Sequence, residues 1–114
     1  MNIEKLRELG ANVDEGLERC MGMEDFYLQL IATQLEDGNF SRLENALDEG
    51  DVAAAFDAAH ALKGALANLA LTPLAGPVSE ITERLRNAAG PVDVSDIMPA
   101  YKEALERLLE IARK

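Results

Sequence analysis

Apolar residues recur at the three- and four-residue spacing of an α-helix in nearly every long stretch of this chain, and no stretch alternates as a strand would. The pattern is strongest between residues 52 and 70. The residues that fall on one stripe of a helical wheel there are Val52, Ala55, Ala59, Leu62, Leu66 and Leu69. Ala and Leu are abundant, and both are strong helix formers. The sequence therefore predicts an all-α fold.

The periodic stretches divide into two short pieces, residues 2–9 and 13–21, followed by four longer helices. The first long pattern, from about 24 to 48, contains Asp37-Gly38-Asn39. We expect a kink or a break there, because Gly in a helix costs about 1 kcal/mol relative to Ala. Short links make neighbouring helices antiparallel. We therefore predict one domain over residues 1–114, with one or two short N-terminal helices in 1–22 and an up-down-up-down four-helix bundle in 24–112.

Several helix boundaries carry recognisable capping residues. Gly50 is placed to end one helix, and Asp51 to accept hydrogen bonds at the start of the next. Thr72-Pro73 resembles an N-cap followed by proline at the first helical position of a helix that runs to about residue 88. Ser95 is a candidate cap for the last helix.

Charge and composition exclude several classes of function. The chain has 21 acidic against 11 basic residues and a net charge of −10, which disfavours nucleic-acid binding because that depends on basic side chains. We find no carboxylate cluster with metal-ligand spacing and no glycine-rich phosphate loop, so we expect no metal and no cofactor. Cys20 is the only cysteine and is expected to pack as a small apolar residue. Without an apolar signal core or membrane span, we expect a cytoplasmic protein.

His60 is the only histidine and lies within the most helical stretch. It is rotated about 100° from the apolar stripe, which places it on the flank of its helix. Lys63 and Gly64 follow three and four residues later, so they line the same side. A neutral imidazole can accept a phosphoryl group, a nearby ammonium can offset its charge, and glycine leaves room for a bulky partner. Phe56, four residues earlier, is positioned to wall the other side of the ring.

These residues taken alone also have an ordinary interpretation. A single histidine on a helix flank is more often a half-buried surface residue than a reactive group. A lysine such as Lys63 is common on the solvent-facing side of a helix, and a glycine can mark a place where two helices cross. Spacing and composition thus predict a helical bundle with an open histidine and no specific role for it.

The string Ala59-His60-Ala61-Leu62-Lys63-Gly64 resembles the His-x-Leu-Lys-Gly signature of histidine-containing phosphotransfer (HPt) domains. The segment that runs up to Gly50-Asp51 is similar to the family's approach to its active helix. Downstream, residues 67–69 and the amphipathic stretch 74–85 are similar to its third bundle helix and the approach to it. The resemblance covers about residues 24–112.

The resemblance implies roles for individual residues. It implies that His60 is phosphorylated on the outer ring nitrogen, that Lys63 steadies the phosphoryl group, and that Gly64 clears a path for the partner. Thr82 stands where the family usually has a Glu or Gln that holds the ring's inner nitrogen, with Ser79 one turn earlier as an alternative. Arg86 falls where some members carry a basic residue near the phosphoryl group.

Three positions depart from the family pattern. Thr82 replaces a longer acid or amide, Ala70 replaces a glycine that often ends the active helix, and Gly76-Pro77 is unusual in the third helix.

The resemblance also implies a docking surface for the partner, made of apolar residues near the histidine. Val13, Leu17 and Met21, with Ala61 beside His60, are the candidates, and Phe26 is a further candidate packed behind the first three. The alternative is that the N-terminal residues only cap the open end of the bundle.

The implied function is that of a phosphoryl carrier in a two-component phosphorelay rather than an enzyme. The implied partners are the receiver domains of response regulators and of a hybrid histidine kinase, which supply the aspartate and a divalent ion. We expect a monomer that binds neither nucleic acid nor membrane. The alternatives are a helical adaptor that binds a receiver domain or another partner without phosphotransfer, and the dimerisation helix pair of a histidine kinase. The kinase signature fits poorly, because Ala61 follows the histidine in place of an acid.

Overall fold

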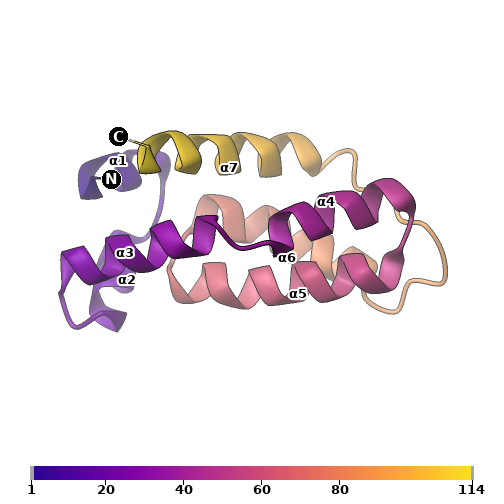
Figure 1. The fold of residues 1–114 in the computed structure, drawn as a ribbon, viewed down its shortest axis with the longest axis horizontal. Helices are drawn as coiled ribbons and strands as arrows, with labels where there is room; N and C mark the ends of the chain where they lie inside the picture. Colours follow the sequence, from indigo (N-terminus) through magenta and orange to yellow (C-terminus); the bar gives the residue numbers. More distant parts are fainter. Residues whose placement is uncertain (1, 114) are drawn as a thin grey trace.

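The computed structural model describes residues 2–113, and this part of the chain is all-helical, with seven α-helices and no strand. The helices are α1 (Ile3–Leu9), α2 (Val13–Arg19), α3 (Glu24–Leu35), α4 (Asn39–Glu49), α5 (Val52–Asn68), α6 (Thr72–Leu85) and α7 (Met98–Ala112). Helices α3 and α4 follow one another along the molecule, and α5 returns beside α4 (Figure 1). Helix α6 packs on α5, and α7 packs on α6 and α3. The predicted all-α bundle with short N-terminal helices is confirmed.

The two short N-terminal helices are defined by caps. The Asn2 side chain accepts a hydrogen bond from the backbone N–H of Glu4 at 2.7 Å, and α1 ends at Leu9, followed by the C-cap residue Gly10 with a φ of 108°. Asn12 caps α2 in the same way. The second helix ends at Arg19 rather than at Met21 as predicted, because Met21 itself has a left-handed backbone with φ 56°.

The break expected in the first long helix is present between α3 and α4. The Asp37 carboxylate accepts a hydrogen bond from the backbone N–H of Asn39 at 2.8 Å. This local bond competes with continuation of the helical ladder. The chain therefore ends α3 at Leu35 and restarts as α4 at Asn39.

Helix α5 starts and ends near the predicted residues. The Asp51 carboxylate accepts a hydrogen bond from the backbone N–H of Ala54 at 3.1 Å. Gly50 is the C-cap residue of α4 and has a φ of 71°. The predicted apolar stripe is buried except for Val52, which is half-buried. Ala70 follows α5 with a φ of 57°, so it adopts the conformation for which the family often has glycine.

The boundaries of the last two helices differ from the prediction. Thr72 is the first residue of α6 rather than its cap. Helix α6 ends at Leu85, short of residue 88, because Arg86 is extended and Asn87 has a φ of 59°. Ser95 does not cap α7, which begins at Met98. The backbone N–H of Ser95 instead donates a hydrogen bond to the Asp93 carboxylate at 2.9 Å.

Helices α2 and α3 are tied to the C-terminal end of α5. The Arg19 guanidinium donates to the backbone carbonyls of Ala67 and Asn68 at 2.6 and 3.0 Å. The buried Tyr27 hydroxyl donates to the Leu69 carbonyl at 2.7 Å. These bonds supply side-chain donors to carbonyl groups at the end of α5, where few backbone donors remain. Cys20, on the same part of the chain, is buried as expected.

The Tyr27 bond predicts a dependence of stability on pH. Burial raises the pKa of the Tyr27 hydroxyl to about 12, from an ordinary value of 10.0. The folded state holds this proton more tightly than the unfolded state does. The contribution of the Tyr27 hydroxyl to the free energy of unfolding is therefore complete below pH 10 and is lost as the pH rises towards 12. Tyr27→Phe should lower the free energy of unfolding at neutral pH by about 1–2 kcal/mol, since it leaves the Leu69 carbonyl without its donor.

Chemical denaturation of both proteins across this pH range measures the effect. The difference in unfolding free energy between wild type and Tyr27→Phe should shrink as the pH approaches 12. A difference that stays constant across the range would contradict the assignment to this hydroxyl.

Candidate functional site

The His60 side chain is exposed on the outer flank of α5. Its neighbours Ala59 and Leu62 are fully buried, so the helix turns its apolar stripe inward and leaves the imidazole in solvent. The predicted position of the histidine is confirmed. An exposed imidazole is open to a reacting partner without movement of the bundle.

The imidazole of His60 stacks on the ring of Phe56, one turn earlier on α5. The ring centroids are 5.6 Å apart and the planes differ by 15°. The guanidinium of Arg86, just after α6, lies 5.3 Å from the centroid of the Phe56 ring. Phe56 therefore walls one side of His60, as predicted, and a cation–π contact holds Arg86 close to the site.

Two cations near His60 are bound to one carboxylate. The Lys63 ammonium lies 3.1 Å from Glu83 Oε1. The Arg86 Nε donates to Glu83 Oε2 at 3.0 Å, and its Nη2 donates to Oε1 at 3.4 Å. The hydrogen bonds from Arg86 and then from Lys63 lower the pKa of the Glu83 carboxyl to about 2. Glu83 is therefore a charged carboxylate at any neutral pH. The five residues His60, Phe56, Lys63, Glu83 and Arg86 are called the His60 cluster below.

The side of His60 opposite Phe56 is open. Gly64, one turn later, is exposed, and a Cβ built on it would meet no atom within 4 Å. Ala61 is also exposed. A bulky partner can therefore approach the imidazole over these two small residues.

Thr82 is the main correction to the predicted site. Its side chain is 0% exposed, and its hydroxyl donates to the Val78 carbonyl of its own helix at 2.7 Å. Ser79 is half-buried. Within residues 2–113 the structure gives no hydrogen bond between His60 and either hydroxyl. The short threonine side chain bonds to its own backbone, whereas the longer side chain usual at this position could extend away from α6.

Glu83, the residue after Thr82, is the site residue that the sequence prediction missed. It carries a charge opposite to Arg86 three residues later on the same helix, which is a spacing that favours ion pairs. That signal identifies the pair with Arg86. The contact with Lys63, twenty residues earlier in the chain, depends on the packing of α6 against α5.

The predicted docking residues fall into two groups. Val13 is only 1% exposed and belongs to the core, so its assignment to a docking surface was wrong. Leu17 is half-buried against the core. Met21, by contrast, is 80% exposed. The large exposed apolar side chains of the described residues are Met21, Met23, Phe26 and Leu30, called the apolar patch below.

The apolar patch lies on the turn between α2 and α3 and on α3 itself. Arg19 and Tyr27 tie these two helices to the end of the helix that carries His60. The N-terminal segment therefore both covers core residues, through Val13, and exposes an apolar surface.

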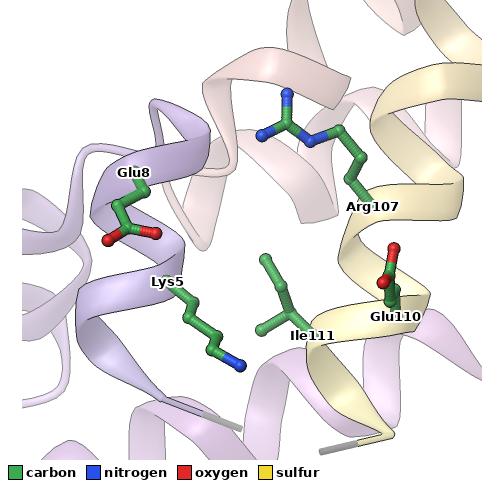
Figure 2. Close-up of a pocket in the computed structure, with 5 residues that line it drawn as sticks. All are labelled: Lys5, Glu8, Arg107, Glu110 and Ile111. Carbon is green, nitrogen blue, oxygen red and sulfur yellow. The ribbon is translucent and has the colours of Figure 1, made fainter.

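A separate hollow lies between α1 and α7. Its lining residues are Lys5, Glu8, Arg107, Glu110 and Ile111. Figure 2 shows these side chains projecting from the two helices around the gap between them. None of them belongs to α5 or α6, so this hollow is separate from the His60 cluster.

The described residues form neither a metal-binding cluster nor a membrane-spanning helix. No group of three or more His, Cys, Asp or Glu side chains is arranged to hold a metal ion among them. None of the helices from residue 2 to residue 113 combines the length and the apolar character that crossing a bilayer requires.

The sequence was compared with family models, curated proteins and solved structures. The Hpt domain model matches residues 37–111, which include the whole His60 cluster and exclude α1, α2 and α3. This match begins later than residue 24, where the resemblance was expected to begin. No curated protein and no solved structure matched significantly. The chain belongs to the Hpt domain family, the histidine phosphotransfer modules of two-component signalling.

Proposed function

We propose that this chain is a phosphoryl carrier that accepts a phosphoryl group on His60 from an aspartyl phosphate of a receiver domain and returns it to another. The observation that carries this proposal is the exposed imidazole between a stacked aromatic ring and an open glycine, with two cations nearby. Membership of the Hpt domain family supports it.

The transfer step follows from ordinary imidazole chemistry. The lone pair of the outer ring nitrogen, Nε2, forms a bond to phosphorus, and the P–O bond to the aspartate breaks. The electron pair of that bond remains on the aspartate carboxylate, while the ring keeps the proton on Nδ1. The reverse step regenerates neutral His60 and a new aspartyl phosphate. The partner supplies the aspartate and the divalent ion in this scheme.

The residues around His60 have separate tasks in this step. Phe56 limits the orientations of the ring by stacking on it. Lys63 and Arg86 offset the negative charge that gathers on the transferring group. Gly64 and Ala61 leave space for the receiver domain to bring its aspartate to the ring.

The receiver domain is proposed to dock over α5 and to reach the apolar patch at α2 and α3. The patch combines large side chains with high exposure, Met21 above all. Exposed apolar clusters of this kind mark protein interaction sites. The bonds of Arg19 and Tyr27 hold the patch at a fixed place relative to α5.

Incubation with a phosphorylated receiver domain of the same organism tests the proposal. The wild-type protein should gain a label that is labile in acid and stable in alkali, as expected of a phosphohistidine. If the protein binds receivers but takes no label from any of them, the helical adaptor is the better description.

Access over Gly64 leads to a second prediction. Gly64→Gln should slow transfer by about ten- to a hundred-fold, because a displaced partner loses the alignment of the reacting atoms. Helix content measured by circular dichroism should remain unchanged, since the new side chain meets open space. Ala100→Gln, an equivalent change at an exposed position of α7, should transfer at the wild-type rate. Equal rates in all three proteins would show that open access at Gly64 is not required.

A further inference from the structure

Glu83 occupies the position between the two cations of the site. Lys63 reaches it from α5, one turn after His60, and Arg86 reaches it from the end of α6. Arg86 also lies over the ring of Phe56, on which His60 stacks. In the unphosphorylated protein, the two cations best placed to meet a phosphoryl group are therefore already paired with one carboxylate, which offsets part of their charge.

Phosphorylation of His60 changes this balance of charge. The phosphoryl group adds up to about two negative charges and three strong acceptor oxygens. It competes with Glu83 for the same donors on Lys63 and Arg86. The Glu83 carboxylate also repels the phosphoryl group, since it stays charged at neutral pH.

We propose that Glu83 is a positioning residue that holds Lys63 and Arg86 in the unphosphorylated state and opposes the arrival of the phosphoryl group on His60. This inference rests on the proposed function and adds an internal competitor to it. Glu83 acts through the two cations and through its own negative charge, and it does not touch the reacting atoms. Its effect keeps phosphohistidine less stable than the two cations alone would make it, so onward transfer is favoured.

The arrangement differs from the other ion pairs on α6. Glu80 pairs with Arg84 at 3.2 Å on the same helix, and Arg84 is also held by Asp96 through two further bonds. Among residues 2–113, none of these three forms a hydrogen bond or ion pair with the His60 cluster. Glu80 is therefore a matched control for Glu83 in residue type, helix and exposure.

The test uses phosphoramidate, a small donor that needs no partner protein. Phosphoramidate reacts as its N-protonated zwitterion: the His60 Nε2 lone pair forms the new N–P bond, the donor's P–N bond breaks with its electron pair on nitrogen, and the donor nitrogen leaves as neutral ammonia while the ring keeps its Nδ1 proton. The rate at which His60 is phosphorylated is followed by ³¹P NMR for wild type, Glu83→Gln and Glu80→Gln. Glu83→Gln should be phosphorylated about two- to five-fold faster, the size expected for exposed ion pairs, and Glu80→Gln at the wild-type rate.

Two further measurements separate this role from a purely structural one. The difference between Glu83→Gln and wild type should shrink in high salt, because screening weakens all exposed charges. It should also shrink in a Lys63→Gln background, because Glu83 then has one cation fewer to hold. A structural defect would instead appear in the free energy of unfolding and would not depend on Lys63.

The outcomes distinguish the two proposals. If wild type and Glu83→Gln are phosphorylated at His60 at the same rate, the role of Glu83 is overturned while the carrier function stands. If neither phosphoramidate nor a phosphorylated receiver domain phosphorylates His60 in any of these proteins, the carrier function fails and the role of Glu83 fails with it.

Discussion

His60→Gln will take no phosphoryl label from a phosphorylated receiver domain. A glutamine amide nitrogen has no free lone pair comparable to that of imidazole, so no stable N–P bond can form. The other described residues include no second imidazole to take its place. We therefore expect label to fall from the wild-type level to background, measured by acid lability and alkali stability of the bound phosphate.

The fold of this variant should be unaffected, because the His60 side chain is exposed and only its stacking on Phe56 is lost. Receiver binding should persist, since the apolar patch and Gly64 are unchanged. Lys102→Gln, at an exposed position of α7 outside the His60 cluster, should be labelled as wild type is. Retained label in His60→Gln would place the phosphoryl group on another residue.

Gly16→Ala will lower the stability of the domain. A Cβ built on Gly16 would lie 2.5 Å from both Cε1 and the hydroxyl oxygen of Tyr27. Tyr27 is fully buried and its hydroxyl is bonded to the Leu69 carbonyl, so the ring cannot move without losing that bond. Overpacking of this kind costs about 1–3 kcal/mol, and it outweighs the gain of about 1 kcal/mol from replacing a helical glycine.

Gly64→Ala is the matched control for this change. Gly64 also lies inside a helix, but a Cβ there would meet nothing within 4 Å. This variant should gain stability by about 0.5–1 kcal/mol, because alanine loses less backbone freedom on folding. Urea denaturation of the two variants should give shifts of opposite sign. A gain in both would show that the contact with Tyr27 relaxes without cost.

The helices could be predicted because the signals for them are local. The buried stripe of α5 follows from the spacing of Ala55, Ala59 and Leu62 alone, and His60 must then lie on the flank. The break near Gly38 and the caps at Gly50 and Asp51 depend on residues next to one another in the chain.

The errors arose where a residue had a choice of partner. The hydroxyl of Thr82 was predicted to hold His60, but bonds to the Val78 carbonyl one turn away on its own helix. Val13 was assigned to a docking surface because it is apolar, and apolar residues on a short helix serve a core or a partner equally well. Helix α6 ends early because Asn87 turns left-handed, and asparagine tolerates that conformation without requiring it.

The sequence by itself determined the helical class, the exposed flank position of His60 and its nearness to Lys63 and Gly64, because helical spacing alone settles these relations. Only the tertiary structure decided which carboxylate holds Lys63, since Glu83 comes from another helix. It also decided why Gly16 cannot carry a side chain, which depends on a tyrosine of α3 packed against α2. Such contacts depend on how helices pack against one another, and a periodic sequence pattern specifies a helix face without naming its neighbour.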